Sequence, residues 1–300
     1  MWQPDPSWVV LPGGRGALTV GTWRVGLGGT THVVKRVRAP APDEAGFTDP
    51  AGAGYWRREA EFALAGVRPH GLVPPEVHRV EEDEEGYTIW SLEVAADAGP
   101  PPALFVARAL ARLAADPAPD APWAARELLR SRLAHREGWP TLARTTFADL
   151  AEELWRRRRS LLDRCASLPL VPAHGDVVPA NLVAMRADEV CTVDWGCFGA
   201  APAGADLGYY ALSCREEFDV LLDAHLAALD DLGVPARPDH VALAARTHAV
   251  YTVVARAEWA LSRVAPGEGA LAGKLRHPAV APHLRALQRQ FPQIEALLAS

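Results

Sequence analysis

The side chains best suited to do chemistry lie in one stretch in the second half of the chain. It begins with the tripeptide His-Gly-Asp at residues 174–176, continues to Asn181, and ends with Asp-Trp-Gly at residues 194–196. Carboxylates, carboxamides and imidazoles bind cations and transfer protons. The residues between Asn181 and the second aspartate decide whether these groups can meet.

Those intervening residues predict a β-hairpin, because an apolar run, a polar turn and a second apolar run follow one another. With the turn centred after residue 187, Met185 pairs with Val190 and Asn181 lies opposite Asp194. Directly opposed residues of an antiparallel pair lie about 4.5–5.5 Å apart at Cα. Asn181 and Asp194 are therefore expected to share one Mg²⁺ ion, which prefers oxygen ligands.

Asp176 lies on the loop that leads into this hairpin, close to the expected cation. Its carboxylate can accept a proton from an incoming hydroxyl group, or orient that group for in-line attack on a phosphate. The alternative is that Asp176 and Asn181 are ordinary turn residues that bond their own backbone. The order and spacing of the whole block favour phosphoryl transfer.

This block resembles the motif of the aminoglycoside phosphotransferase and choline kinase family, whose members have a protein-kinase-like fold of two lobes. The resemblance extends over most of the chain, but only this block is specific. It implies that Asp176 is the catalytic base, that Asn181 and Asp194 bind Mg²⁺, and that His174 braces the catalytic loop. Asp206 is similar to the family's structural aspartate, and it can equally cap the helix that follows it.

By the same resemblance, Lys35 looks like the lysine that contacts the α- and β-phosphates of the nucleotide. The alternative is an exposed strand end. Its partner is expected to be a glutamate on the next helix. Glu59 borders the predicted buried stripe of that helix, and Glu61, which lies further from the stripe, is the reserve candidate.

Three glycines near the N-terminus, Gly13, Gly14 and Gly16, are expected to form the loop over the phosphates, because missing side chains let backbone N–H groups approach. Taken alone, they equally suit a plain hairpin turn. The segment that contains Leu92 and Val94 is expected to be the hinge that bonds the base of the nucleotide through its backbone. Backbone contacts leave no sequence signature, so ATP and GTP both stay open.

The elements that must position these side chains predict an α+β chain with a β-rich first part and a helical second part, and the family resemblance implies that the two parts form a bilobal protein-kinase-like fold. Residues 1–94 are expected to form a small antiparallel-sheet lobe with one helix, ending in the hinge, and residues 95–300 a larger, mostly helical lobe. Alternating apolar residues and turn residues predict strands at 8–11, 17–25, 31–37, 77–80 and 87–92. Helical spacing predicts helices at 55–65, 104–115, 123–135, 147–167, 216–232, 238–263 and 282–298.

The acceptor is expected to be the hydroxyl group of a small molecule, such as an aminoglycoside, an amino alcohol, a sugar or a related metabolite. Only residues 197–205 separate the Asp-Trp-Gly motif from Asp206, which leaves little room for a protein-kinase activation segment. Acidic residues in the later helices can attract a cationic acceptor or simply form a solvated face. Among them, Glu258 is a candidate substrate contact, because its helix is otherwise apolar. The alternative functions are a nucleotide-binding protein without transfer activity and a metal-dependent hydrolase.

The composition excludes other classes. A formal net charge of −6 argues against a nucleic-acid-binding protein, whose surface would be basic. The 4 cysteines show no CxxC pairing, and no signal peptide is recognised, so reduced thiols and a cytoplasmic location are expected. No apolar run reaches the length of a membrane span. The sequence does not indicate an oligomeric state.

Overall fold

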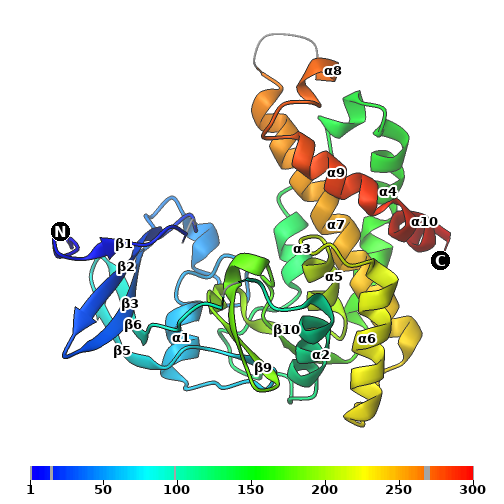
Figure 1. Cartoon of the computed structure of the whole chain (residues 1–300). Helices are drawn as coiled ribbons and strands as arrows, with labels where there is room; N and C mark the ends of the chain where they lie inside the picture. The colour runs from blue at the N-terminus through cyan, green and yellow to red at the C-terminus, as the bar shows by residue number, and fades with distance from the viewer. Residues whose placement is uncertain (1, 14–15, 98, 267–270, 300) are drawn as a thin grey trace.

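The computed structural model of the protein describes residues 2–13, 16–97, 99–266 and 271–299. A five-stranded antiparallel sheet dominates the N-terminal lobe, in the order β1-β2-β3-β6-β5 (Figure 1). Its strands are β1 (Val9–Val10), β2 (Thr19–Leu27), β3 (Thr30–Arg38), β5 (Val77–Asp83) and β6 (Gly86–Leu92).

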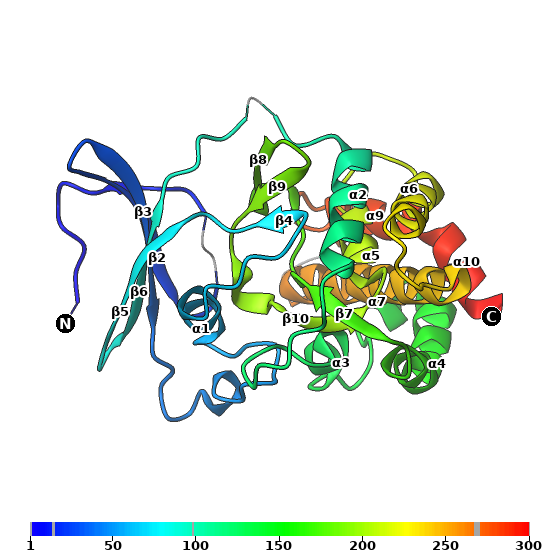
Figure 2. The same cartoon turned by 90° about the horizontal axis from the view of Figure 1, so that it is seen from below.

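Both faces of this sheet are covered. On one face, the helix α1 (Arg58–Leu64) packs through Ala60 against Val37 and Ile89 (Figure 2). On the other, Trp23 and Trp90 form a second apolar cluster. Alternate residues of a strand point to opposite faces, so the central strands β3 and β6 contribute to both clusters. The sheet therefore gives Lys35, in the middle of β3, a rigid support.

The C-terminal lobe is mostly helical, and its core is one large apolar cluster. Its longest helix, α7 (Pro238–Val264), runs through the middle of the lobe with α5, α4, α9 and α10 around it (Figure 1). The other helices are α2 (Ala103–Ala114), α3 (Leu128–Leu133), α4 (Ala148–Ala166), α5 (Ala205–Ala211), α6 (Phe218–Asp231), α8 (Leu271–Lys274), α9 (Ala281–Arg289) and α10 (Phe291–Ala299).

Short strands lie where the N-terminal lobe meets the helices (Figure 2). The hairpin of β8 (Leu182–Arg186) and β9 (Glu189–Thr192) is joined by β4 (Leu72–Val73), which pairs with β9 in parallel. A separate antiparallel pair is formed by β7 (Leu170–Ala173) and β10 (Gly199–Pro202). Single turns of 3₁₀ helix occur at Ala45–Phe47, Leu142–Arg144, Pro179–Asn181 and Trp195–Cys197.

The sequence-based prediction of the elements was wrong in three places. The strands β4, β7 and β10 were not predicted, since two to four residues are too few for a period to be recognised. Of the helix expected at 123–135, only α3 is helical, because Glu127 has a left-handed backbone (φ 46°) through which an α-helix cannot continue. The helix expected at 282–298 divides into α9 and α10, because Pro292 cannot donate its backbone hydrogen bond.

Within the described residues, no helix is both long and apolar enough to cross a membrane.

Candidate active site

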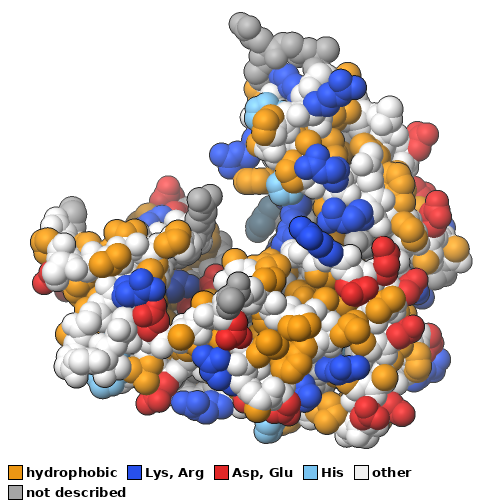
Figure 3. All heavy atoms as spheres, viewed as in Figure 1, with side chains coloured by type: hydrophobic (Ala, Val, Ile, Leu, Met, Phe, Trp, Pro, Cys, Tyr) orange, Lys and Arg blue, Asp and Glu red, His pale blue; other side chains and the backbone are white. Residues whose placement is uncertain are grey.

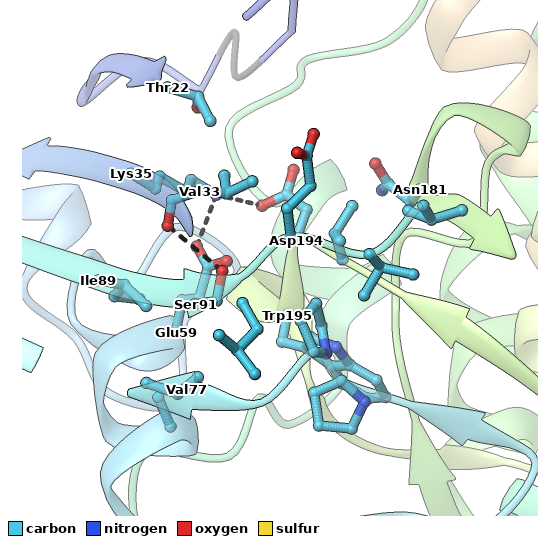
Figure 4. Close-up of a pocket in the computed structure, with 18 of the residues that line it drawn as sticks. Thr22, Val33, Lys35, Glu59, Val77, Ile89, Ser91, Asn181, Asp194 and Trp195 are labelled. Atoms are coloured by element: carbon cyan, nitrogen blue, oxygen red, sulfur yellow. Dashed lines mark hydrogen bonds and ion pairs between the residues drawn. The ribbon is translucent and has the colours of Figure 1, made fainter. Parts of the chain in front are cut away.

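A cavity of about 660 Å³ lies between the N-terminal sheet and the β8–β9 hairpin. Its walls carry Lys35 from β3, Glu59 from α1, and Asn181 and Asp194 from the two ends of the hairpin (Figure 4). Elements from both halves of the chain therefore bring polar side chains to one enclosed space. Apolar residues such as Val33, Val77 and Ile89 line another part of the same cavity.

Lys35 forms ion pairs with two acidic side chains of the cavity. Its Nζ donates to Glu59 Oε2 at 2.6 Å and to Asp194 Oδ1 at 2.7 Å (Figure 4). Burial alone would lower the pKa of Lys35, but the two carboxylates outweigh that effect and raise the pKa, so the side chain stays cationic. The reserve candidate, Glu61, lies instead 3.5 Å from Arg57 on the outside of α1.

The two carboxylates differ in their access to the cavity. The Glu59 side chain is 15% exposed, whereas that of Asp194 is 43% exposed. Burial raises the pKa of Glu59 even though Lys35 opposes the rise. For Asp194 the balance is reversed, because Lys35 lowers its pKa against the effect of burial. Asp194 is therefore the carboxylate that stays ionised and can turn to a ligand in the cavity.

Asp194 has a strained backbone, with φ of 65°, two residues after the end of β9. Such left-handed non-glycine residues persist only where the surroundings fix them. Trp195 provides that support, since its ring stacks on Phe62 of α1 with 4.5 Å between centroids and 8° between planes. Arg58, which is fully buried, adds a hydrogen bond of 3.0 Å to the Gly196 carbonyl. The helix α1 thus holds both Glu59 and the turn that carries Asp194.

The register of the β8–β9 hairpin agrees with the prediction near its turn and differs at its open end. Met185 pairs with Val190 as expected. A β-bulge at Val183 then shifts the pairing by one residue, because one strand has an extra residue there. Asn181 consequently lies opposite Val193, whose N–H donates to the Asn181 carbonyl at 3.0 Å, and the prediction that it opposes Asp194 was wrong.

Asp176 lies on the loop after β7 and is held by two side chains. The Asn181 amide nitrogen donates to its backbone carbonyl at 2.9 Å and to Oδ2 at 3.3 Å. The Tyr209 hydroxyl donates to Oδ1 at 2.6 Å. Tyr209 was missed by the sequence analysis, although its position three residues after Asp206 on α5 puts both on one helix face, which was an available signal.

His174 is fully buried beside Asp176. Its Nδ1 accepts from the Asp176 N–H at 3.3 Å, and its Nε2 donates to the Val193 carbonyl at 3.1 Å. The ring therefore links the loop of Asp176 to the hairpin. Between them, Gly175 has φ of 78°, and a Cβ there would lie 2.5 Å from the Cys197 carbonyl oxygen, so only glycine fits.

Asp206 anchors the same loop from α5. Its two carboxylate oxygens accept the N–H groups of His174 at 2.7 Å and Gly175 at 2.9 Å. The alternative of a helix cap was wrong, because Gly204 occupies the N-cap position of α5 and the Asp206 carboxylate points to the other loop. Burial raises the pKa of Asp206, and the two N–H donors oppose that rise.

The expected phosphate-covering loop is described only in part. Gly13 lines the cavity, with φ of 130°. Gly14 lies outside the described residues. The Gly16 carbonyl accepts from the Thr19 N–H at 3.0 Å, in the turn that begins β2.

Leu92 and Val94, the expected hinge residues, both line the cavity. The Leu92 N–H is used by Glu76 at 2.8 Å, and the N–H of the next residue, Glu93, donates to Thr31 at 2.9 Å. Leu92 and Val94 therefore lie at the cavity where the chain leaves the sheet, while the N–H groups of Leu92 and Glu93 are already bonded within the protein.

Glu258 is not a substrate contact. It is 4% exposed, and its carboxylate accepts the backbone N–H groups of Thr141 at 3.0 Å and Leu142 at 2.8 Å. A carboxylate in an otherwise apolar helix suggests a functional residue in the sequence. Here the carboxylate accepts the N–H groups at the start of a neighbouring 3₁₀ helix.

The acidic residues between α5 and the end of α6 form a solvated face. They are exposed, and Asp219 lies 3.6 Å from Arg246. The set comprises Glu216, Glu217, Asp219, Asp223, Asp230 and Asp231.

Comparison with known proteins places this geometry in a family. A family model described as "Phosphotransferase enzyme family" matches residues 21–240, more than half of the chain. Curated protein sequences gave no match.

Solved structures share the fold at low identity. A choline kinase from Streptococcus pneumoniae has a TM-score of 0.56 at 13% identity, over 97% of this chain and 94% of that one. A choline/ethanolamine kinase family protein from Mesorhizobium loti has a TM-score of 0.52 at 17% identity, over 94% and 92%. An aminoglycoside phosphotransferase from Streptomyces rimosus, in complex with ADP and streptomycin, has a TM-score of 0.51 at 18% identity, over 82% and 94%. The predicted α+β, protein-kinase-like fold is thereby confirmed.

Proposed function

Because this chain belongs to the phosphotransferase enzyme family, we propose that it is a Mg²⁺-dependent small-molecule kinase that transfers the γ-phosphate of ATP or GTP to a hydroxyl group. One observation carries the proposal. In a single cavity, Lys35 contacts both Glu59 and Asp194, while Asn181 reaches from the same cavity to Asp176. A cation, an ionised carboxylate, a carboxamide and a candidate base are the parts that phosphoryl transfer requires.

The nucleotide would occupy the cavity with its base at the hinge. Leu92 and Val94 line the cavity, and so do apolar residues such as Val33 and Ile89, which a purine ring would contact. The phosphates would then extend toward Gly13 and Lys35. With this orientation, residues 1–94 would serve as the nucleotide-binding lobe and residues 95–300 as the catalytic and substrate-binding lobe.

The donor set of the cavity fits Mg²⁺. Asp194 offers a partly exposed carboxylate, and the Asn181 amide nitrogen is used by Asp176, which leaves the Asn181 side-chain oxygen for a ligand. Two hard oxygen donors are what Mg²⁺ usually takes from a protein when phosphates and water complete its coordination. When bound, the ion would neutralise charge on the phosphates.

The chain's own residues then have separate tasks. Lys35 holds the phosphates, and Glu59 holds Lys35 in position. The acceptor's hydroxyl oxygen forms a bond to the γ-phosphorus, the bond from that phosphorus to the β–γ bridging oxygen breaks, and the hydroxyl proton moves to the Asp176 carboxylate. The products are the phosphorylated acceptor and ADP or GDP. His174 and Asp206 act through the backbone, by fixing the loop that carries Asp176.

A cytoplasmic location is part of the proposal, and it is supported by 4 cysteines that are all free thiols.

The test is ADP or GDP release with Mg²⁺ against a panel of aminoglycosides, amino alcohols, sugars and hydroxy acids. Asp176→Asn is expected to lower acceptor-dependent release at least about a hundredfold, with nucleotide affinity almost unchanged. Asp188→Asn, in the exposed turn of the hairpin, is the matched control and should behave as the wild type. Wild-type turnover in Asp176→Asn would remove Asp176 from the mechanism. Nucleotide binding without release for any acceptor would favour a binding protein that lacks transfer activity.

A further inference from the structure

A second cavity, of about 400 Å³, lies in the C-terminal lobe between the end of α5, the second half of α7 and α9. Four of the side chains that line it are basic: Arg256, His283, Arg285 and Arg289. Among the described residues, the others that line it are apolar and none is a carboxylate. Figure 3 shows Lys and Arg side chains gathered over α7 and α9, on the side of this lobe that faces the opening between the lobes.

The arginines of this cavity form no ion pair with a described residue. No carboxylate oxygen of the described chain lies within 4.0 Å of Arg256, Arg285 or Arg289, and Arg289 donates to the Leu212 carbonyl at 3.5 Å. At the start of α7 the situation is different, since Arg237 pairs with Asp239 at 2.8 Å. Unpaired cations around a hollow raise the local concentration of anions.

This basic cavity is connected to the proposed base by one side chain. The Arg256 guanidinium lies 4.6 Å from the centroid of the Tyr209 ring, and the Tyr209 hydroxyl donates to Asp176 Oδ1 at 2.6 Å. Tyr209 thus contacts both Arg256 and Asp176, so the basic cavity lies one aromatic ring away from the candidate base. His283 completes the cavity as a neutral donor, because burial and the neighbouring Arg256 lower its pKa.

We propose that the phosphate acceptor of this protein is anionic: a small hydroxyl compound with a carboxylate or a phosphate group, which is held by Arg256, Arg285 and Arg289. Guanidinium groups match both anions, since their N–H donors form paired hydrogen bonds with two oxygens. The inference rests on the proposed function, and it replaces the cationic acceptor that the acidic residues of the sequence suggested. Those residues lie on the solvated face of α6 described above.

The first test compares small hydroxyl compounds of different charge: glycolate and ethanolamine, which have two carbons each and opposite charge, and glycerol 3-phosphate as a second anion. The double variant Arg285→Glu/Arg289→Glu changes two exposed side chains, so the fold is expected to tolerate it. It should raise KM for an anionic acceptor at least about tenfold and leave KM for the nucleotide unchanged. Arg159→Glu, at an exposed position of α4, is the control for net charge. An amine acceptor whose KM is insensitive to the double variant would overturn the inference while preserving the kinase.

The second test does not depend on turnover. Calorimetric titration with inorganic phosphate or glycolate, in the presence of MgADP to fill the nucleotide cavity, measures the anion site directly. Binding that the double variant weakens about tenfold and Arg159→Glu does not would support the site even if no acceptor is phosphorylated. A stronger response to glycolate or to phosphate would identify the carboxylate or the phosphate class. No anion binding to the wild type at millimolar concentrations would refute the inference, whatever the outcome for the nucleotide.

Discussion

Replacing Tyr209 by phenylalanine would remove a single hydroxyl group, the one that donates to Asp176 Oδ1 at 2.6 Å. The bond is short and its acceptor is a carboxylate, so it belongs to the strong, charge-assisted class. Such a bond contributes about 1.5–3 kcal/mol. If about half of that free energy serves to hold the Asp176 carboxylate toward the acceptor, kcat should fall about three- to tenfold, since about 1.4 kcal/mol corresponds to a factor of ten in rate.

The nucleotide should not sense the change, because Tyr209 is absent from the residues that line the large cavity. We therefore expect KM for ATP or GTP to stay constant while kcat decreases, measured by ADP or GDP release with the acceptor found in the panel. A purely structural role would lower stability and affect both constants together. Tyr209 is thus expected to act as a positioning residue for Asp176.

Tyr210 provides the matched control, because it is the next residue of α5 and belongs to the apolar core. Tyr210→Phe removes the same atom from the same helix without touching Asp176. Equal kcat values for Tyr209→Phe and the wild type would refute the reasoning. An equal decrease in Tyr210→Phe would show that α5, and not the hydroxyl group, was perturbed.

Three further predictions concern nucleotide binding, the anchoring of the catalytic loop and the pH dependence of stability. Lys35→Ala leaves the Glu59 and Asp194 carboxylates without their shared cation, so KM for the nucleotide should rise at least about tenfold. Wild-type kinetics in this variant would show that another cation binds the phosphates. Asp206→Asn removes one of two acceptors for the backbone N–H groups of the catalytic loop. We expect a loss of about 1.5–3 kcal/mol in the free energy of unfolding by urea and a strong decrease in turnover. An unchanged midpoint of the urea unfolding curve would contradict the anchoring role. Burial lowers the pKa of His225 to about 4 from its ordinary 6.5, so the unfolded chain binds this proton first. His225 should therefore contribute about 2 kcal/mol to the decrease in the free energy of unfolding between pH 7.5 and pH 5, and His248, whose pKa burial also lowers to about 4, adds to that decrease. His225→Gln should flatten that pH dependence by the same amount, and an identical slope would exclude His225 as its source.

The motif that carries the chemistry could be interpreted from the sequence because its parts are local. Asn181 and Asp194 belong to one hairpin, and the turn between them fixes the pairing of Met185 with Val190. The bulge at Val183 could not be predicted, since the apolar run continues through it without interruption. A single extra residue changed which residue faces Asn181.

Contacts between distant segments were not predictable in the same way. Lys35 and Asp194 are 159 residues apart, and only the docking of α1, through Phe62 on Trp195, brings them within hydrogen-bond distance. Glu258 shows the opposite error. Its setting in an apolar helix suggested function, whereas the tertiary structure gives it two backbone N–H groups to accept. Periodicity identifies which helix face is buried but not what that face meets.

The charge of the acceptor site illustrates the same limit. The acidic residues of α6 form an obvious cluster in sequence, but they point to solvent. Arg285 and Arg289 lie on α9, but Arg256 lies on α7, so no local pattern joins the three arginines of the second cavity. The three arginines line one cavity only because α9 packs on α7.

The environment of Tyr209 also determines which side chain can take the proton of the acceptor's hydroxyl group. The ring lies between two guanidinium groups, Arg132 at 5.3 Å and Arg256 at 4.6 Å, which would favour the phenolate. Burial nevertheless raises the pKa of Tyr209 to about 12, with the Asp176 carboxylate acting in the same direction. Tyr209 therefore keeps its proton at neutral pH and can only donate. Asp176 has a second oxygen that faces Asn181, so it remains the group that can accept the proton of an attacking hydroxyl.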